Sequence, residues 1–262
     1  MNTKYLERYN YLLEIIKPIG EVALEYSHNI SKLNIKEKSP QNLVSEVDLK
    51  IEKLLINKIS ARFENDNILG EESSFKDENN SKSIWIIDPI DGTLPFLSGL
   101  PHWCISIAFL AENQLIFGVV FAPFSGELFH GFLGQGAYLN NQKLLGEKDS
   151  LNPGFVALGY TLRVDINQIA QVQKGLFELG VVSYLNGSGA LMICYTAASK
   201  LNGYIEPHIY SWDMAAGIII ASEAGLKHNI IPDSTWLSEG SSLLVAPQNN
   251  YNKLAEIIPW KL

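Results

Sequence analysis

An apolar run that ends in two aspartates constrains the fold of this chain more than any other feature. Trp85–Ile87 leads directly into Asp88, and Asp91 follows three residues later, just before Gly92-Thr93. If two carboxylates are buried next to an apolar run, both lose their hydration and they repel each other, so burying them without a positively charged partner is costly. The segment therefore predicts a strand end at which a cation lies between two acids.

Periodic apolar residues predict two helices in the first part of the chain. The first covers residues 1–28, and Pro18 should kink or divide it. The second covers Val47–Phe63, with Ser45 and Asp48 as its capping box. The polar segment between them, Lys36–Leu43, is predicted to be a loop or a short strand.

The later pattern predicts two halves of different class. Strands are expected first at 84–87, 103–110, 115–121 and 127–132. Further strands are expected at 155–159, 182–185, 203–206 and 242–246, alternating with helices at 167–179, 190–201, 212–224 and 251–258. Clustered strands followed by alternation predict an α+β half over residues 1–150 and an α/β half over 151–262, joined near Gly146–Pro153.

Composition narrows the classes of function. The chain has 262 residues, 47% of them hydrophobic, and a net charge of −8, which argues against a general nucleic-acid binder. No apolar run approaches the roughly 20 residues that cross a bilayer, so no membrane role is expected. The N-terminus does not resemble a signal peptide. Cys104 and Cys194 lack metal-ligand spacing and read as buried thiols, which favours the cytoplasm.

Acids at element ends suggest a metal site. Glu71 in Gly70–Ser73, the pair Asp88 and Asp91, Asp213, and Asp48 all stand near such ends. Mg²⁺ prefers oxygen ligands of this kind, and the sequence offers no Cys/His cluster for zinc.

The turn after Asp88 is expected to place several oxygens together. Asp88, the Ile90 carbonyl and Asp91 should converge on one cation. Gly92 permits close approach of the backbone, and Thr93 is expected to cap a short helix over residues 94–98. The amides at that helix start would face a phosphate. Asp88 and Asp91 could instead merely close a turn, and Asp48 could merely cap its helix.

The chain resembles the inositol monophosphatase family of the lithium-sensitive, Mg²⁺-dependent sugar phosphatases. The matching motifs are Gly70-Glu71-Glu72-Ser73, Asp88-Pro89-Ile90-Asp91-Gly92-Thr93, Trp212-Asp213-Met214-Ala215-Ala216-Gly217, Glu223-Ala224-Gly225, and Lys38-Ser39-Pro40 through Leu43-Val44-Ser45 to Asp48. The resemblance implies a layered α/β/α/β/α fold, a homodimer, lithium inhibition and a small phosphorylated substrate. Inositol monophosphate stands first among substrates. Histidinol phosphate, fructose 1,6-bisphosphate, 3′-phosphoadenosine 5′-phosphate and NADP are the alternatives.

The resemblance also assigns roles to individual residues. Two or three Mg²⁺ ions would be held by Glu71, Asp88, the Ile90 carbonyl, Asp91 and Asp213. Glu71, Thr93 and Asp48 would orient and deprotonate a metal-activated water for in-line attack on phosphorus. Substrate contacts would come from Asp91, Gly92, Thr93, Gly189, Glu206 and Asp213.

Some positions depart from the family pattern. They are Asn42, Leu94-Pro95, Tyr184 and Met192. They bear on specificity and subunit contact more than on catalysis. A second hypothesis of another class is a catalytically silent relative that acts as a binding or regulatory subunit. Such a relative would lose ligand carboxylates, whereas this chain keeps those that the family motifs contain.

Overall fold

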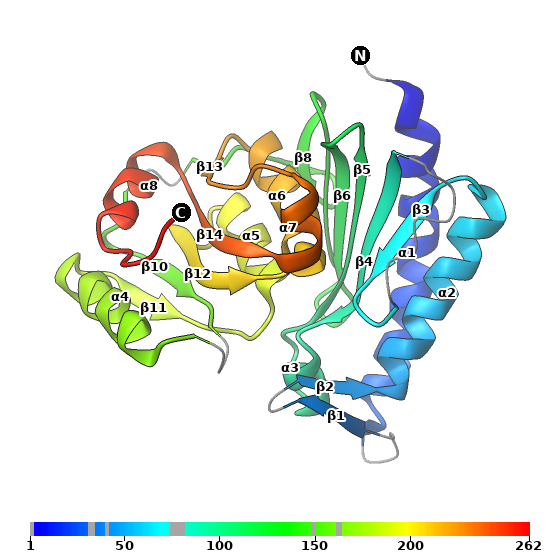
Figure 1. Ribbon diagram of the computed structural model, residues 1–262, viewed down its shortest axis with the longest axis horizontal. Helices are drawn as coiled ribbons and strands as arrows, with labels where there is room; N and C mark the ends of the chain where they lie inside the picture. Colours follow the sequence, from blue (N-terminus) through cyan, green and yellow to red (C-terminus); the bar gives the residue numbers. More distant parts are fainter. Residues whose placement is uncertain (1–2, 31–34, 40–41, 74–81, 148–149, 161–163) are drawn as a thin grey trace.

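The computed structural model describes residues 3–30, 35–39, 42–73, 82–147, 150–160 and 164–262, and it is layered helix–sheet–helix–sheet–helix (Figure 1). Helices α1 (Leu6–Ser27) and α2 (Glu46–Arg62) cover the outer face of a seven-stranded sheet. Helices α5 (Gly189–Ala197) and α6 (Ser211–Glu223) lie between this sheet and a five-stranded one. The predicted α/β/α/β/α arrangement is confirmed.

The seven-stranded sheet has the order β3-β4-β5-β6-β7-β8-β9, and all its pairs except β3–β4 are antiparallel. Its strands are β3 (Asn67–Gly70), β4 (Ser83–Asp91), β5 (Cys104–Ala111), β6 (Gln114–Ala122), β7 (Glu127–Phe132), β8 (Gly136–Leu139) and β9 (Gln142–Leu144). The strands predicted at 84–87, 103–110, 115–121 and 127–132 correspond to β4–β7. The short strands β3, β8 and β9 were not predicted, because each is too short for a clear apolar alternation.

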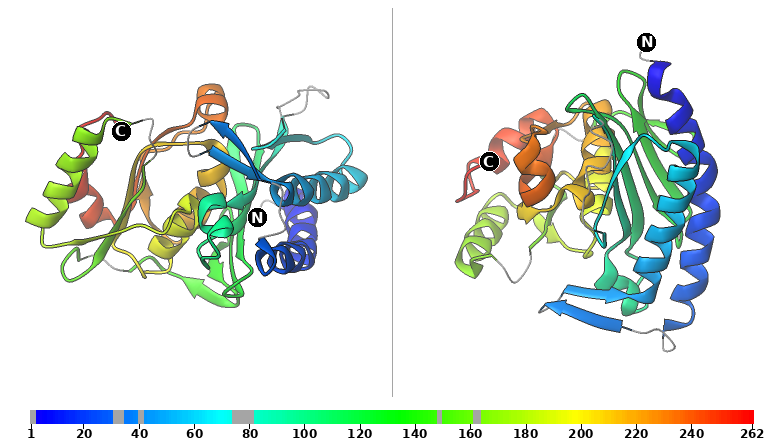
Figure 2. Two further views of the ribbon diagram at one scale, coloured as in Figure 1. Left: turned by 90° about the horizontal axis from the view of Figure 1, so that it is seen from below. Right: turned by 45° about the vertical axis from the view of Figure 1, so that its right-hand side comes forward.

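The five-stranded sheet has the order β11-β10-β12-β14-β13 and mixes parallel with antiparallel pairs. Its strands are β10 (Phe155–Leu158), β11 (Val182–Tyr184), β12 (Gly203–Ile209), β13 (Lys227–His228) and β14 (Ser241–Ala246). Helices α4 (Ile166–Glu178) and α8 (Gln248–Ala255) pack on its outer face, as the views of Figure 2 show from two sides. Every strand predicted beyond residue 150 is present.

The remaining elements are short. They are the 3₁₀ turn Thr3–Tyr5, the hairpin β1 (Ile35–Ser39) and β2 (Asn42–Ser45), α3 (Thr93–Leu97) and α7 (Ser234–Glu239). The segment 36–43 therefore contains strand, although Pro40 and Gln41 lie outside the described residues. Asn42 is described only as part of β2, without its side chain.

Helix α1 runs without interruption through Pro18, so the predicted division of this helix is wrong. Leu12, Ile16 and Ile19, around the proline, are buried against the sheet, and this packing offsets the loss of one helical hydrogen bond. Helix α2 begins with the predicted capping box of Ser45 and Asp48. Helix α5 ends at Ala197 rather than at the predicted residue 201. Within the described part of the chain, no helix is long and apolar enough to cross a bilayer.

Candidate metal and phosphate site

Strand β4 carries the two motif aspartates at its end. Its pairing with β5 places Asp88 opposite Ser106 and Asp91 opposite Cys104, with a register shift between them. We expected the strand to end at Asp88, but it continues to Asp91 through this irregularity. Because Pro89 cannot donate to the ladder, the strand bulges, and a bulge re-aims the side chains that flank it.

The bulge brings Asp88 and Asp91 together with Asp213 from helix α6. Each offers a carboxylate oxygen, and these oxygens all lie within 4.8 Å of one another. Asp88 Oδ1 accepts the Ile90 amide at 2.9 Å, whereas its Oδ2 is buried and receives no hydrogen bond from a donor group among the described residues. Burial, followed by the charges of Glu71 and Asp91, raises the pKa of Asp88 well above its usual range. A buried carboxylate oxygen among other acids is what a divalent cation would neutralise, so the donor set fits Mg²⁺.

Asp91 is held by donors from the other half of the chain. Its Oδ2 accepts the Ser188 hydroxyl at 2.5 Å and the Ala190 amide at 2.8 Å, and its Oδ1 accepts the Gly189 amide at 3.2 Å. Burial raises its pKa to about 6, and these hydrogen bonds oppose the shift. The chain thus fixes this carboxylate between the end of β4 and the start of α5.

Asp213 lies in the first turn of α6 and is partly exposed. Its Oδ2 accepts the Tyr210 amide at 3.3 Å, which closes the helix start. Loss of water around the side chain, then repulsion from Asp91, raises its pKa to about 8. The three aspartates therefore resist sharing this space as three negative charges, and a cation would relieve that repulsion.

Thr93 joins the β4 turn to helix α2. Its hydroxyl lies 3.2 Å from Asp48 Oδ1 and 3.1 Å from the Ile90 carbonyl oxygen, and it can donate to either. Asp48 is buried and also accepts the Ser45 amide at 2.9 Å, and burial raises its pKa. Thr93 does not cap α3 as expected, because it is the first helical residue and Gly92 precedes it as the N-cap.

Gly92 adopts a left-handed backbone with φ of 93°. A Cβ at this position would lie 2.7 Å from the His102 carbonyl oxygen. Both the positive φ and this close approach require glycine. The predicted turn at Gly92 is therefore present, and it directs the chain from β4 into α3.

Glu71 lies at the edge of the same site. Its amide donates to the Ile87 carbonyl at 3.1 Å, which places the Gly70–Ser73 segment beside β4. Its charge contributes to the raised pKa of Asp88, second only to burial. Among the described residues, Glu71 is not in the group whose oxygens lie within 4.8 Å, so its carboxylate stands farther from that group.

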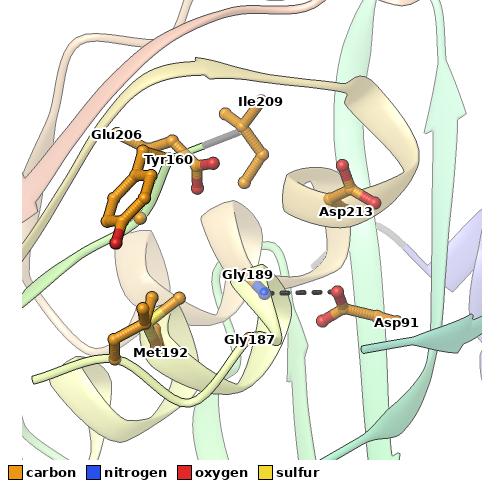
Figure 3. A pocket seen from close by; sticks show the side chains of 10 residues that line it. Asp91, Tyr160, Gly187, Gly189, Met192, Glu206, Ile209 and Asp213 are labelled. Carbon is orange, nitrogen blue, oxygen red and sulfur yellow. Dashed lines mark hydrogen bonds between the residues drawn. The ribbon is translucent and has the colours of Figure 1, made fainter. Parts of the chain in front are cut away.

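A cavity of about 180 Å³ opens beside the acids (Figure 3). Its lining consists of Asp91, Gly159, Tyr160, Leu185, Gly187, Gly189, Met192, Glu206, Ile209 and Asp213. Glu206 is buried, accepts the Tyr204 hydroxyl and has a pKa raised to about 8 by burial. Figure 3 shows Glu206 and Tyr160 across the cavity from Asp91. The predicted residues Asp91, Gly189, Glu206 and Asp213 therefore share one cavity.

The departures from the family pattern lie in different places. Met192 lines the cavity, whereas Tyr184 is not among the lining residues and its ring lies 6.5 Å from that of Phe155. Leu94 is exposed, and Pro95 is buried close to Gly187. Of the four, Met192 therefore bears most directly on what the cavity accepts.

Sequence reasoning missed the part that four residues play around this site. Ser188 was read only as part of a small-residue turn, although a serine just before a helix signals an N-cap, and it caps α5. No local sequence pattern identified Tyr204 and Tyr160, because neighbouring strands of the five-stranded sheet bring them to the site. Cys104 Sγ lies 3.6 Å from Asp91 Oδ2, and burial raises the pKa of this thiol.

The proteins that are similar to this chain include some named Nus factor SuhB and others named inositol monophosphatase. The Nus factor SuhB of Xylella fastidiosa is 32% identical over 219 residues, covering 82% of this chain and 79% of that protein. Inositol monophosphatase 1 of Sus scrofa is 33% identical over 233 residues, covering 86% of this chain and 84% of its own.

Solved structures share the whole fold. The crystal structure of extragenic suppressor protein suhB from Bartonella henselae superposes with a TM-score of 0.89 at 25% identity, covering 98% of this chain and all of that one. A sequence model of the inositol monophosphatase family matches residues 5–259. With Asp91 and Asp213 of the motifs at one cavity and this match over nearly the full length, the chain belongs to the inositol monophosphatase family.

Proposed function

We propose that this protein is a Mg²⁺-dependent phosphomonoesterase that hydrolyses a small phosphorylated polyol or sugar, with inositol monophosphate as the foremost substrate. The observation that carries the proposal is the buried, unpartnered Oδ2 of Asp88 within the group of Asp88, Asp91 and Asp213. That group borders a cavity large enough for part of a small ligand. Family membership supports a phosphatase.

Two or three Mg²⁺ ions would be held by the carboxylates of Glu71, Asp88, Asp91 and Asp213 and by the Ile90 carbonyl. Bound Mg²⁺ supplies charge neutralisation and polarises the phosphoryl oxygens. The protein's own part is to hold these acids close together despite their repulsion. Asp91 is fixed by the start of α5 and Asp213 by the start of α6, so both carboxylates are oriented before any ligand arrives.

The pair of Thr93 and Asp48 is suited to move a proton. The attacking water would transfer its proton to the Thr93 hydroxyl oxygen as that hydroxyl passes its own proton to Asp48. Burial raises the pKa of Asp48, which makes it a better proton acceptor than a solvated aspartate. Glu71 would help to orient the same water, and the amides of Gly92 and Thr93 would meet the phosphate.

The leaving group would occupy the cavity. Glu206 would accept hydrogen bonds from substrate hydroxyls at the far wall, and Gly189 would let the ring approach the start of α5. The water oxygen would form the new bond to phosphorus, the ester P–O bond would break, and inorganic phosphate and an alcohol would leave. Histidinol phosphate, fructose 1,6-bisphosphate, 3′-phosphoadenosine 5′-phosphate and NADP remain alternatives for the same chemistry.

Phosphate release from a panel of these compounds, with Mg²⁺ and with a chelator, tests the proposal. We expect Mg²⁺-dependent turnover, with the highest kcat/KM on an inositol monophosphate. Absence of metal-dependent turnover on every compound would refute the enzyme proposal. A higher kcat/KM on another compound would change only the substrate.

The name of one relative, Nus factor SuhB, favours a second candidate function. In this alternative the chain is a catalytically silent relative that acts as a binding or regulatory subunit. The acids Asp88, Asp91 and Asp213 are all present in this chain, which favours the enzyme over the silent relative. The phosphate-release panel separates the two.

Four expectations accompany the proposed function. They are assembly as a homodimer, the absence of nucleic-acid and membrane partners, a cytoplasmic location, and the division into functional units at residues 1–150 and 151–262. Light scattering of the purified chain would test the dimer. A nucleic-acid binding assay at physiological salt would test the second expectation, since binding there would contradict it.

A further inference from the structure

Ser188 and Asp91 meet from opposite halves of the chain. Ser188 is fully buried and is the N-cap of α5, whereas Asp91 ends β4, 97 residues earlier. The Ser188 hydroxyl lies 2.5 Å from Asp91 Oδ2, the shortest of the contacts that hold this carboxylate. The contact therefore ties a candidate metal ligand directly to the helix that borders the cavity.

The surroundings of Ser188 fix the direction of this hydrogen bond. The Leu191 amide donates to Ser188 Oγ at 3.3 Å, and the Ser188 amide donates to Asn186 Oδ1 at 2.9 Å. Because Oγ already accepts a hydrogen bond from the Leu191 amide, its own hydrogen is free to point at Asp91 Oδ2, which lies nearer than Cys104 Sγ at 3.6 Å. The hydroxyl thus acts as an oriented donor rather than a freely rotating one.

All the strong donors approach Asp91 from the α5 side. The amides of Ala190 and Gly189 add to the Ser188 hydroxyl, and Figure 3 shows the Gly189 contact at the edge of the cavity. Asp91 Oδ1 accepts only the Gly189 amide among the described residues, so this oxygen keeps a lone pair for a cation. Outer partners of a ligating carboxylate commonly set its orientation, and their loss costs about 10–100-fold in metal affinity or activity.

We propose that Ser188 is a positioning residue that orients the Asp91 carboxylate toward the metal and so couples cation binding to the wall of the substrate cavity. The inference rests on the proposed function and deepens it. In this role Ser188 would act through Asp91 rather than by its own contact with phosphate or metal. Gly187, Gly189 and Met192, on either side of it, line the cavity, so a shift of this helix start would alter both sites.

Calorimetric titration of the metal-free protein with MgCl₂ tests this inference. For Ser188→Ala we expect the dissociation constant to rise at least about tenfold, and turnover to recover in part at high Mg²⁺ concentration. Ser188→Thr keeps the hydroxyl and should bind within about threefold of the wild type. Thr196→Val is the matched control, because Thr196 is a buried hydroxyl of the same helix that donates only to the Met192 carbonyl at 2.9 Å.

Equal Mg²⁺ affinity in the wild type, Ser188→Ala and Thr196→Val would overturn the inference, as would equal weakening by Ser188→Ala and Thr196→Val. If Ser188→Ala does not fold, Ser188→Cys decides, since it keeps a side chain of similar size with a weaker donor and should bind Mg²⁺ more weakly than Ser188→Thr. A wild-type protein that binds no Mg²⁺ would instead refute the proposed function. The two failures are therefore distinguishable.

Discussion

The acid group, which consists of Asp88, Asp91 and Asp213, differs from the cavity beside it in how firmly the polar side chains are held. In the acid group, Asp91 receives the Ser188 hydroxyl and two amides, and Asp213 is tied to its helix start. In the cavity, Glu206 is held by Tyr204, and the lining between it and the acids includes Leu185, Met192 and Ile209. Fixed acids constrain the reaction, whereas apolar walls leave more freedom for the leaving group. Substitutions in the two regions should therefore have different kinetic signatures.

The largest effect is expected from Asp91→Asn in the acid group. It removes the charge at the centre of the candidate ligand set, so turnover should fall about 1,000-fold or more on every substrate. Thermal unfolding should stay close to that of the wild type, because an amide oxygen can still accept from Ser188 and Ala190. A rate near the wild-type value would contradict the role given to Asp91.

Thr93→Val should lower kcat about 100-fold on all substrates, because it removes the hydroxyl between the water and Asp48 while keeping the side-chain shape. Thr93→Ser is the matched control and should retain most of the rate. Initial rates at saturating substrate give the comparison. Equal losses in the two variants would mean that the methyl group matters rather than the hydroxyl.

Glu206→Gln should act on the cavity alone. We expect kcat/KM for a hydroxylated substrate to fall about tenfold, as when one hydrogen bond to the substrate is lost. An aryl phosphate without hydroxyl groups should lose no more than about twofold in kcat/KM. Equal losses on both would place Glu206 with the acid group and remove the contrast between the two regions.

The smallest expected effect concerns the pH dependence of stability without metal. Asp213 and Glu206 have pKa values raised to about 8, so the folded state binds their protons more tightly than the unfolded state does. Stability should therefore fall as pH rises from about 4, near the unfolded values, to 8, by at most about 1.4 kcal/mol per pH unit for each group. Thermal unfolding between pH 6.5 and 8 measures this slope.

Metal and mutation should separate the two contributions to that slope. Saturating Mg²⁺ should remove the part due to Asp213 and to Asp88, whose pKa burial also raises, and Glu206→Gln should remove the part due to Glu206. His130 and His228 have lowered pKa values, so their effect is a loss of stability below about pH 6.5, outside this window. If the stability of the metal-free protein instead rises between pH 6.5 and 8, then ionising Asp213 and Glu206 does not destabilise the folded state, which would contradict this prediction.

Much of this molecule was predictable from local sequence. The capping box of α2, strands β4–β7 and the convergence of Asp88 with Asp91 follow from short motifs and their spacing, whereas the family resemblance placed Asp213 with them. The family motifs also predicted the layered fold.

Other features depend on contacts between distant segments. The strand continues past Pro89 because β5 offers an irregular register, which the run of residues 85–91 does not reveal. The donors to Asp91 come from residues 188–190, and the pairing of Tyr204 with Glu206 depends on burial within the five-stranded sheet. Local patterns therefore identified the acids but not what orients them.

Phosphate release as a function of Mg²⁺ concentration, for the wild type and for Asp88→Asn, tests the central claim most directly. Asp88 carries a buried oxygen that receives no hydrogen bond from the part of the chain that the structure describes. We predict a saturable dependence on Mg²⁺ in the wild type and a loss of about 1,000-fold at the same Mg²⁺ concentration in Asp88→Asn. Release that is independent of Mg²⁺, or a rate in Asp88→Asn equal to that of the wild type, would contradict the claim that these aspartates hold a catalytic cation.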